Sequence, residues 1–294
     1  MATAVPRRPD AELAPLIAGY HRAVAARRRR TAMVVLVIIA ASVLAGAVGE
    51  VDPKTFIANI HRLPGYLRDI TPVLTFANLG ADLADWYWNL GHWLNLLVDT
   101  LLIAYLASLA GAVGGFLLCF AASANLTRSR ILRFAARRFL EICRTVPDIV
   151  FALVFVVAFG LGAMPGVMAI AIHSTGALGK LFAEVVENID MKPVEGVTAA
   201  GASWATVVRF AVVPQVLPNF ASYALLRFEI NARSATVIGF VGAGGIGQDL
   251  LEAIRKFYYS DVSAILLLII GMVMIIDVAT ERVRHALIGR DPRR

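Results

Sequence analysis

Cysteine is scarce in this chain of 294 residues. The two cysteines, Cys119 and Cys143, lie inside apolar blocks, where a thiol behaves as a small hydrophobic group. Two such residues provide neither a disulfide framework nor the paired spacing of a zinc site. The sequence therefore argues against a disulfide-stabilised secreted domain, and it offers no candidate metal site.

Recognisable nucleotide-binding motifs are also missing. Gly179-Lys180 is similar to the end of a Walker A loop, but Ser174 stands where that pattern needs glycine, and Leu181 follows the lysine. Residues 242–247 fit G-x-G-x-x-G, yet a dinucleotide site needs a soluble βαβ unit, and here the flanking segments are apolar. We therefore expect no catalytic residue and no bound cofactor in this chain.

Long hydrophobic blocks dominate what is present. Hydrophobic residues make up 59% of the chain, and its mean hydropathy is +0.71. A bilayer core of about 30 Å needs about 20 apolar residues per helix, and several blocks reach that length. Because the blocks lack the alternation of a membrane barrel, the sequence predicts an all-α integral membrane protein with six helices. The first block has no convincing signal-peptide cleavage site, so we expect it to be retained.

The predicted segments follow one another along the chain. A tail of residues 1–30 precedes the first span, 31–49, and an outer segment, 50–93, follows it. Asp-Pro at the start of 53–69 predicts an amphipathic helix there. The membrane core, 94–280, contains the other predicted spans at residues 94–124, 139–161, 167–186, 216–241 and 263–280, and a tail of 281–294 ends the chain.

Basic residues gather on one side of these spans. With the N-terminus inside, the inner segments hold 19 Lys or Arg residues and the outer segments hold 5. The positive-inside rule then places both termini in the cytoplasm. The net charge of +7, including the run 27–30, is explained by this membrane-flanking role, so nucleic acid is not an expected partner.

A mixed stretch, 191–214, separates the fourth and fifth predicted spans. Pro193 suits the start of a helix, Glu195 lies in the first turn, where the helix dipole favours negative charge, and Gly201 interrupts the helix. A second helical run is expected to end at Pro214. The sequence therefore predicts a short helical hairpin on the cytoplasmic side.

This hairpin resembles the cytoplasmic coupling loop of ATP-binding-cassette importer permeases. Their pattern is Glu-Ala-Ala, three residues, glycine, and a later proline. Glu195, Gly201 and Pro214 occupy matching positions, whereas Gly196 and Val197 replace the two alanines. The resemblance implies the six-helix type I importer fold and a contact with an ATPase subunit made by Glu195, Gly201, Ala202 and Pro214.

Polar groups inside the spans are costly and usually face a cavity or a partner. Arg144 and Asp148 are four residues apart and would share a helix face, and Pro147 between them predicts a bend. Glu229 and Arg233 have the same spacing. In the fourth span, polar residues recur near the helical period: His173, Lys180, Glu184 and Glu187. Each group has two interpretations, a structural hydrogen bond or ion pair, and contact with a transported substrate.

Three runs resemble the phosphonate-uptake branch of these permeases, namely 144–148, 173–180 and 233–247. The resemblance covers roughly residues 90–280. It implies transport of a phosphonate-like oxyanion along a path lined by Arg144, His173, Ser174 and Arg233. The glycine run is expected at the outer end of that path as a gate or packing site, formed by Gly242, Gly244, Gly245 and Gly247.

The resemblance also implies partners. These are a second copy of the chain, two ATP-binding subunits that hold ATP and Mg, an extracytoplasmic substrate-binding protein, and the bilayer of a bacterial plasma (inner) membrane. Phosphonate, phosphite and phosphate are all open as cargo. A methionine-type permease, a secondary transporter with Glu229 or His173 as proton relay, and a membrane scaffold without a transport path are the alternatives.

Overall fold

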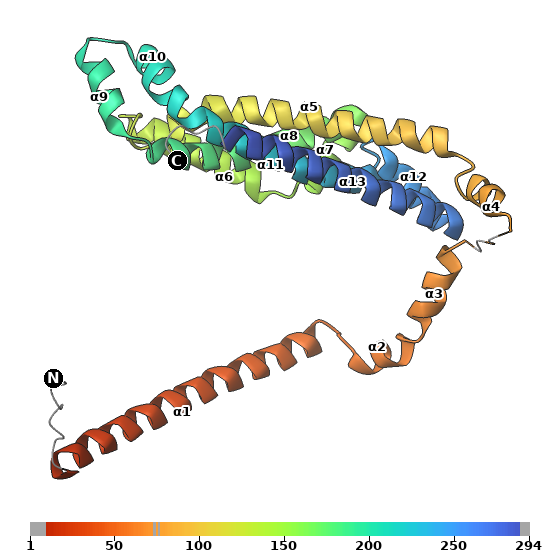
Figure 1. Cartoon of the computed structure of the whole chain (residues 1–294), viewed down its shortest axis with the longest axis horizontal. Coiled ribbons are helices and arrows are strands. Elements are labelled where there is room, and N and C mark those ends of the chain that lie inside the picture. Colours follow the sequence, from red (N-terminus) through yellow and green to blue (C-terminus); the bar gives the residue numbers. More distant parts are fainter. Residues whose placement is uncertain (1–9, 73–74, 76, 289–294) are drawn as a thin grey trace, which may run out of the picture. The chain divides into compact units, whose positions relative to one another are not determined.

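The computed structural model describes residues 10–72, 75 and 77–288, and every regular element in them is helical. The chain divides into two units, Met1–Leu67 and Arg68–Arg294. Figure 1 labels the helices of both units. The ends of the predicted tails, 1–9 and 289–294, lie outside the described residues.

The first unit is dominated by α1 (Asp10–Val48), a single helix of 39 residues. Its apolar part, Ala18–Val48, is long enough to cross a membrane, and none of the apolar window is buried within the protein. The predicted first span, 31–49, is the second half of this helix. Lipid is the natural solvent for such an unburied apolar surface.

Two short helices replace the single amphipathic helix expected over 53–69. Asp52 caps α2 (Pro53–Asn59), which begins at the predicted proline. In a continuous helix, the ring of Pro64 would clash with the carbonyl group four residues earlier. A turn therefore intervenes before α3 (Arg62–Ile70), where the proline falls in the first helical turn and is tolerated.

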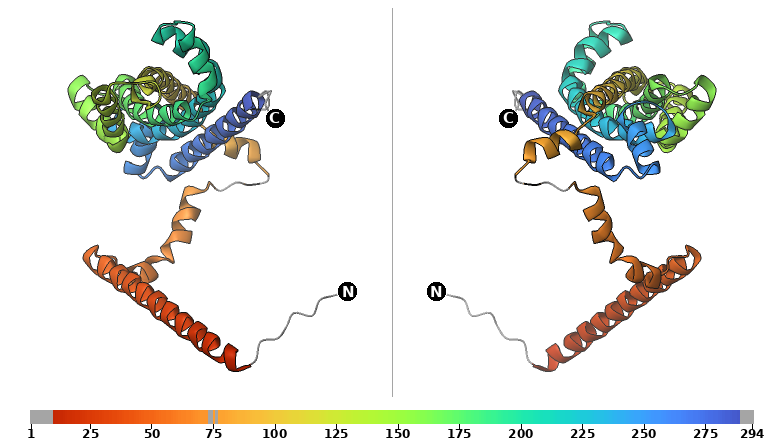
Figure 2. Two further views of the ribbon diagram at one scale, coloured as in Figure 1. Left: turned by 90° about the vertical axis from the view of Figure 1, so that its left-hand side faces the viewer. Right: turned by 90° about the vertical axis from the view of Figure 1, so that its right-hand side faces the viewer.

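The second unit is a bundle of roughly aligned long helices, which Figure 2 shows turned by 90° in each direction. Its longest members are α5 (Leu90–Ala122), α8 (Ala163–Glu187), α11 (Val213–Ile238) and α13 (Tyr259–Ile288). The shorter ones are α4 (Leu79–Trp86), α6 (Arg130–Thr145), α7 (Asp148–Phe159), α9 (Met191–Ala199), α10 (Trp204–Val207) and α12 (Ile246–Arg255). In the described part of the chain, four helices are long and apolar enough to span a membrane, or up to six if two bent pairs are each counted once.

The third and fifth predicted spans are the two bent pairs. The axes of α6 and α7 differ by 85° across the break at Val146 and Pro147, so the predicted span 139–161 is not one straight helix. The bend expected at Pro147 is confirmed. The segment from α10 to Val241 meets α12 at a bend of 48°. Because α12 covers Ile246–Arg255, much of the stretch 242–262, expected as an outer loop, is helical.

The helix predicted to end at Pro214 continues through it. The chain passes from α10 into α11 by a wide turn, Val208–Val212, in which the Val213 N–H donates to the Val208 carbonyl. Pro214 has no N–H to offer the carbonyl of Phe210, and a widened turn absorbs that missing bond without ending the helix. The predicted end was therefore wrong.

Glycines bring α5 and α8 into close contact. A Cβ on Gly111 would lie 2.5 Å from the Ser174 Cβ, and one on Gly115 would lie 2.8 Å from the backbone nitrogen of Gly179. The Gly-x-x-x-Gly spacing of Gly111 and Gly115 on α5 thus permits a close helix approach, with α8 as the partner. This contact fixes the depth at which the polar residues of α8 meet α5.

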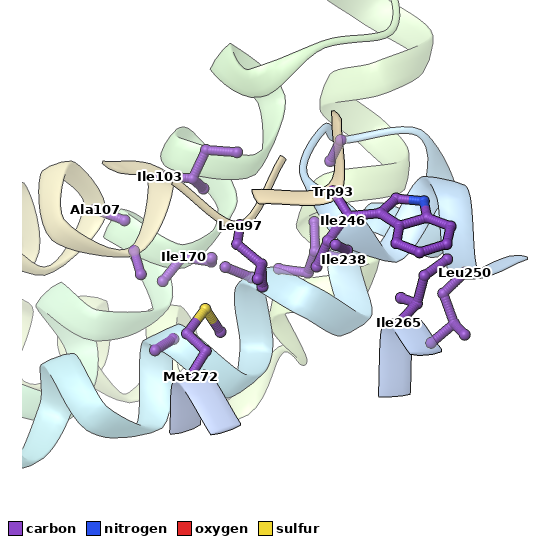
Figure 3. Close-up of a cluster of buried hydrophobic side chains, with 14 of the residues drawn as sticks. Trp93, Leu97, Ile103, Ala107, Ile170, Ile238, Ile246, Leu250, Ile265 and Met272 are labelled. Carbon is purple, nitrogen blue, oxygen red and sulfur yellow. The ribbon is translucent and has the colours of Figure 1, made fainter. Parts of the chain in front are cut away.

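Two apolar cores lie along the bundle. The first contains Trp93, Leu97, Ile238, Ile246 and Ile265, which Figure 3 shows converging from α5, α11, α12 and α13. The second includes Cys119, and Phe182 and Phe220, whose rings stack with centroids 4.0 Å apart. Cys143 is buried as well. On α5, α8 and α11 the residues between the two cores are smaller and more polar.

We predict that Gly115→Ala destabilises the bundle, because the new methyl group must displace the backbone of α8. Overpacking of this kind costs about 1–3 kcal/mol. Gly271→Ala on α13 is the matched control, because nothing lies within 4 Å of its new Cβ. Thermal unfolding of the detergent-solubilised protein measures the difference. Equal melting temperatures for the two variants would contradict the proposed contact.

Candidate functional site

A buried polar layer joins α5, α8 and α11 between the two cores. The Asn231 Nδ2 donates hydrogen bonds to the Ser108 Oγ at 2.8 Å and to the Ser174 Oγ at 2.9 Å. Ser174 and Asn231 have no exposed surface. Polar groups without water are stable only when paired in this way. Ser174, predicted to line a transport path, is therefore held inside the protein.

Arg227 extends this layer toward the surface of the bundle. Its Nε donates to the Ser174 Oγ at 3.1 Å, and its side chain is half-buried. Within the described residues, the two terminal guanidinium nitrogens have no hydrogen-bond partner. Asp148, at the start of α7, attracts the guanidinium electrostatically but forms no ion pair with it at 4.0 Å or less. Arg227 was not among the predicted site residues, although a charge inside an apolar span is itself a functional signal.

One face of α8 is left open between α6 and α11. It carries His173, Ala177, Lys180 and Glu184, which recur at helical spacing, and we call it the α8 polar face. A cavity of about 230 Å³ lies on the α6 side, and one of about 430 Å³ lies on the α11 side. Glu184 lines both cavities, and Lys180 lies 3.8 Å from it. Cavities therefore border this face at Lys180 and Glu184.

The bend between α6 and α7 is fastened to this face. The His173 Nδ1 lies 3.0 Å from the Val146 carbonyl oxygen. Because a carbonyl only accepts, Nδ1 carries the proton and Nε2 is the free nitrogen of the neutral ring. Gly176 brings α6 against α8, since a Cβ there would lie 2.6 Å from the Arg144 backbone nitrogen.

Arg144 and Asp148 do not form the pair expected from their spacing. The bend places them on different helices, and they share no helix face. The Asp148 Oδ1 instead accepts from the Ile149 N–H at 2.9 Å. The Arg144 side chain is exposed and has no hydrogen-bond or ion-pair partner within the described residues.

Arg233 lies in a different environment from the other predicted path residues. It forms the expected ion pair with Glu229 at 2.5 Å and a second with Asp277 of α13 at 3.0 Å. Six residues separate it from Arg227, which is a rotation of about 240° around α11. The structure thus brings Ser174 into contact with Arg227, and it directs Arg233 toward α13.

The predicted hairpin is present as α9 and α10. Asp190 caps α9 by accepting from the Lys192 N–H at 3.0 Å, so the helix starts before Pro193. Gly201 has a φ of +82°, which confirms the predicted interruption and requires glycine. Glu195 is exposed and accepts no hydrogen bond from the described residues. Ala202 packs against the second core, and Pro214 is exposed at the start of α11.

Hydrogen bonds that sequence reasoning missed tie this hairpin to the bundle. The Gln215 side chain bonds to both backbone groups of Asp190, with both distances 3.2 Å. The Asn125 Nδ2 donates to the Val186 carbonyl at 2.7 Å, and the Glu187 carboxylate accepts from the Ala124 N–H at 2.6 Å. These bonds join Asp190, at the start of α9, to α11, and they join the end of α5 to the end of α8.

The glycine run is a tight internal turn. Gly242, Gly244 and Gly245 all have positive φ, and a Cβ on Gly247 would lie 1.8 Å from the Thr236 carbonyl oxygen. Ala243 within the turn is 1% exposed and packs beside the start of α8. These contacts show packing within a single copy of the chain.

Known proteins are similar to this chain in sequence and in fold. The model of the family "Binding-protein-dependent transport system inner membrane component" matches residues 115–290. The phosphite transport system permease protein PtxC of Stutzerimonas stutzeri is 42% identical over 185 residues, 63% of this chain and 67% of that protein. The phosphate-import permease protein PhnE of Mycolicibacterium smegmatis is 39% identical over 199 residues, 68% of this chain and 37% of that protein.

A third relative is shorter. The putative cryptic phosphonate transport system permease protein PhnE2 of Escherichia coli K12 is 49% identical over 121 residues, 41% of this chain and 99% of that protein. The three alignments thus span very different shares of their relatives, from 37% to 99%.

Solved structures support the fold. A chain of the inward-facing MetNI methionine ABC transporter is 20% identical with a TM-score of 0.58, over 68% of this chain and 96% of that one. A chain of a bacterial ABC transporter that imports alginate is 14% identical with a TM-score of 0.53, over 83% and 95%. The predicted all-α importer permease fold is confirmed. Together with the family match, it shows that the chain belongs to the binding-protein-dependent transport system inner membrane components.

Proposed function

We propose that this chain is the membrane-spanning subunit of an ATP-driven importer for a phosphonate, phosphite or phosphate-like oxyanion. The observation that carries the proposal is the identity of 39–49% to three permeases whose names specify phosphite, phosphate or phosphonate. The α8 polar face is consistent with it, because Lys180 and the nearby Arg227 supply donors for an anion.

The assembly that we propose contains two copies of the chain, with the α8 polar faces lining a shared path and both termini in the cytoplasm. A family member of this kind is a multi-pass plasma-membrane protein that works with an extracytoplasmic binding protein and an ATPase. In our proposal ATP and Mg are bound by two separate ATPase subunits. An unpaired polar groove would be unstable against lipid, and a second copy would enclose it.

The alternatives are less well supported. A methionine-type permease shares the fold, but that likeness rests on 20% identity, whereas the named oxyanion permeases are at least 39% identical. A proton-coupled secondary transporter and a scaffold do not explain membership in a binding-protein-dependent family. His173 is also bonded to a backbone carbonyl, which suits a structural role at the bend better than a relay.

We predict that the chain, reconstituted in proteoliposomes with its ATPase and binding protein, takes up phosphite, methylphosphonate or phosphate only when ATP is supplied. Uptake of radiolabelled phosphite, methylphosphonate, phosphate and methionine measures this selectivity. A proton gradient without ATP is the control for secondary transport. ATP-dependent uptake of methionine but of none of the three oxyanions would contradict the proposal.

We propose further that α9 and α10 dock on the ATPase and couple its motion to the bundle. Gly201→Val is expected to disturb the bend, because a left-handed conformation costs about 1–2 kcal/mol for a residue with a side chain. We predict that uptake per ATP hydrolysed falls several-fold while the complex still assembles. Gly80→Val on α4, at a glycine with open space and ordinary φ, is the control.

The hydrolysis and uptake rates should be measured in the same vesicles. Glu195→Ala is expected to weaken ATPase binding, because an exposed carboxylate without a described partner is free to contact another subunit. Normal ATPase binding and normal coupling in both hairpin variants would exclude this docking site.

A further inference from the structure

The intramembrane cations of the bundle differ in how they are neutralised. Arg233 has two carboxylates within 3.0 Å, and Lys180 has Glu184 at 3.8 Å. Arg144 is exposed, and its side chain has no hydrogen-bond or ion-pair partner within the described residues. Arg227 differs from all three, because a neutral partner holds it firmly while its charge has no contact counter-ion.

The fixed orientation of Arg227 comes from the buried polar layer. Its Nε is bonded to Ser174, which is bonded to Asn231, which is bonded to Ser108. This chain of bonds leaves the four N–H groups of the terminal nitrogens without a protein partner among the described residues. A guanidinium fork held in this way matches the spacing of two oxygens on a phosphonate or phosphite group.

Asp148 provides a counter-charge without occupying the fork. Its carboxylate attracts Arg227 from the start of α7 and is bonded to its own helix at the Ile149 N–H. A carboxylate at this distance lowers the free-energy cost of placing an arginine within the membrane. It also weakens the binding of an anion by that arginine. Transport needs both effects, because a site that binds too tightly cannot release its cargo.

The depth of Arg227 suits a transit site. Its partner Ser174 lies 13 residues before the end of α8 at Glu187, which corresponds to about 20 Å along the helix. With that end at the cytoplasmic surface, Arg227 lies about two thirds of the way across a bilayer core of about 30 Å. His173 is next to Ser174 on α8, and Lys180 follows on the α8 polar face toward the coupling hairpin.

We propose that Arg227 is the membrane-embedded docking point for the cargo oxyanion, with Asp148 as the counter-charge that permits release. This inference rests on the proposed function, because it assumes that the cargo is an oxyanion. Two oxygens of the anion would accept hydrogen bonds from the terminal guanidinium nitrogens. Ser174, Asn231 and Ser108 would act as positioning residues that do not touch the cargo.

The test uses the complete reconstituted complex with phosphite as the probe. Arg227→Gln removes the charge and is expected to lower phosphite uptake by about 10- to 100-fold, the effect of losing a charge-assisted hydrogen bond. Arg227→Lys keeps the charge without the fork and should give an intermediate rate. Arg62→Gln, an exposed arginine of α3, is the control.

A second variant keeps the test independent of assembly. Asp148→Asn leaves Arg227 in place and removes the competing charge, so the KM for phosphite should fall severalfold while the maximal rate also falls because release is slower. A wild-type complex that takes up no oxyanion would refute the proposed function and this inference with it. If the Arg227→Gln or the Asp148→Asn complex, at normal yield, takes up phosphite with the kinetics of the wild-type complex, this inference alone is overturned.

Discussion

The close contact between α5 and α8 is the constraint on which the rest of the bundle depends. Gly111 and Gly115 let the two backbones approach so closely that a side chain would collide with α8. At that separation, Ser108 and Ser174 can both reach Asn231 of α11. Three helices are thereby held in one register by hydrogen bonds that have no competing water.

This register in turn determines which arginine side chains of α11 contact a carboxylate. Arg233 faces two carboxylates and forms a link between α11 and α13. Arg227, on another side of α11, has the neutral hydroxyl of Ser174 on α8 as its one hydrogen-bond partner among the described residues. The same helix therefore carries one arginine in ion pairs and one without a contacting carboxylate in the described part of the chain.

Local sequence patterns predicted a large part of this structure. The apolar blocks, the interruption at Gly201 and the Glu229–Arg233 pair were all deduced from residues close together in the chain. Each depends on the geometry of one helix or turn.

Features that depend on distant residues were missed. Asp277 joins Arg233 from 44 residues away, and Arg227 is bonded to a serine 53 residues earlier. The bend at Pro147 was expected, but its size of 85° depends on contacts with α8, and it separates a pair that spacing alone would join. The helix continues past Pro214 because the turn Val208–Val212 is widened, and no local residue pattern predicts such a turn.

The central claim is that the α8 polar face lines an aqueous path, and thiol accessibility tests it most directly. With Cys119 and Cys143 replaced by alanine, Ala177→Cys lies on that face, and Val113→Cys lies on an apolar surface of α5 that is 52% exposed. A charged, membrane-impermeant thiol reagent reacts only where water reaches. Our account predicts labelling at position 177 and none at position 113. Labelling at 113 with none at 177 would contradict it.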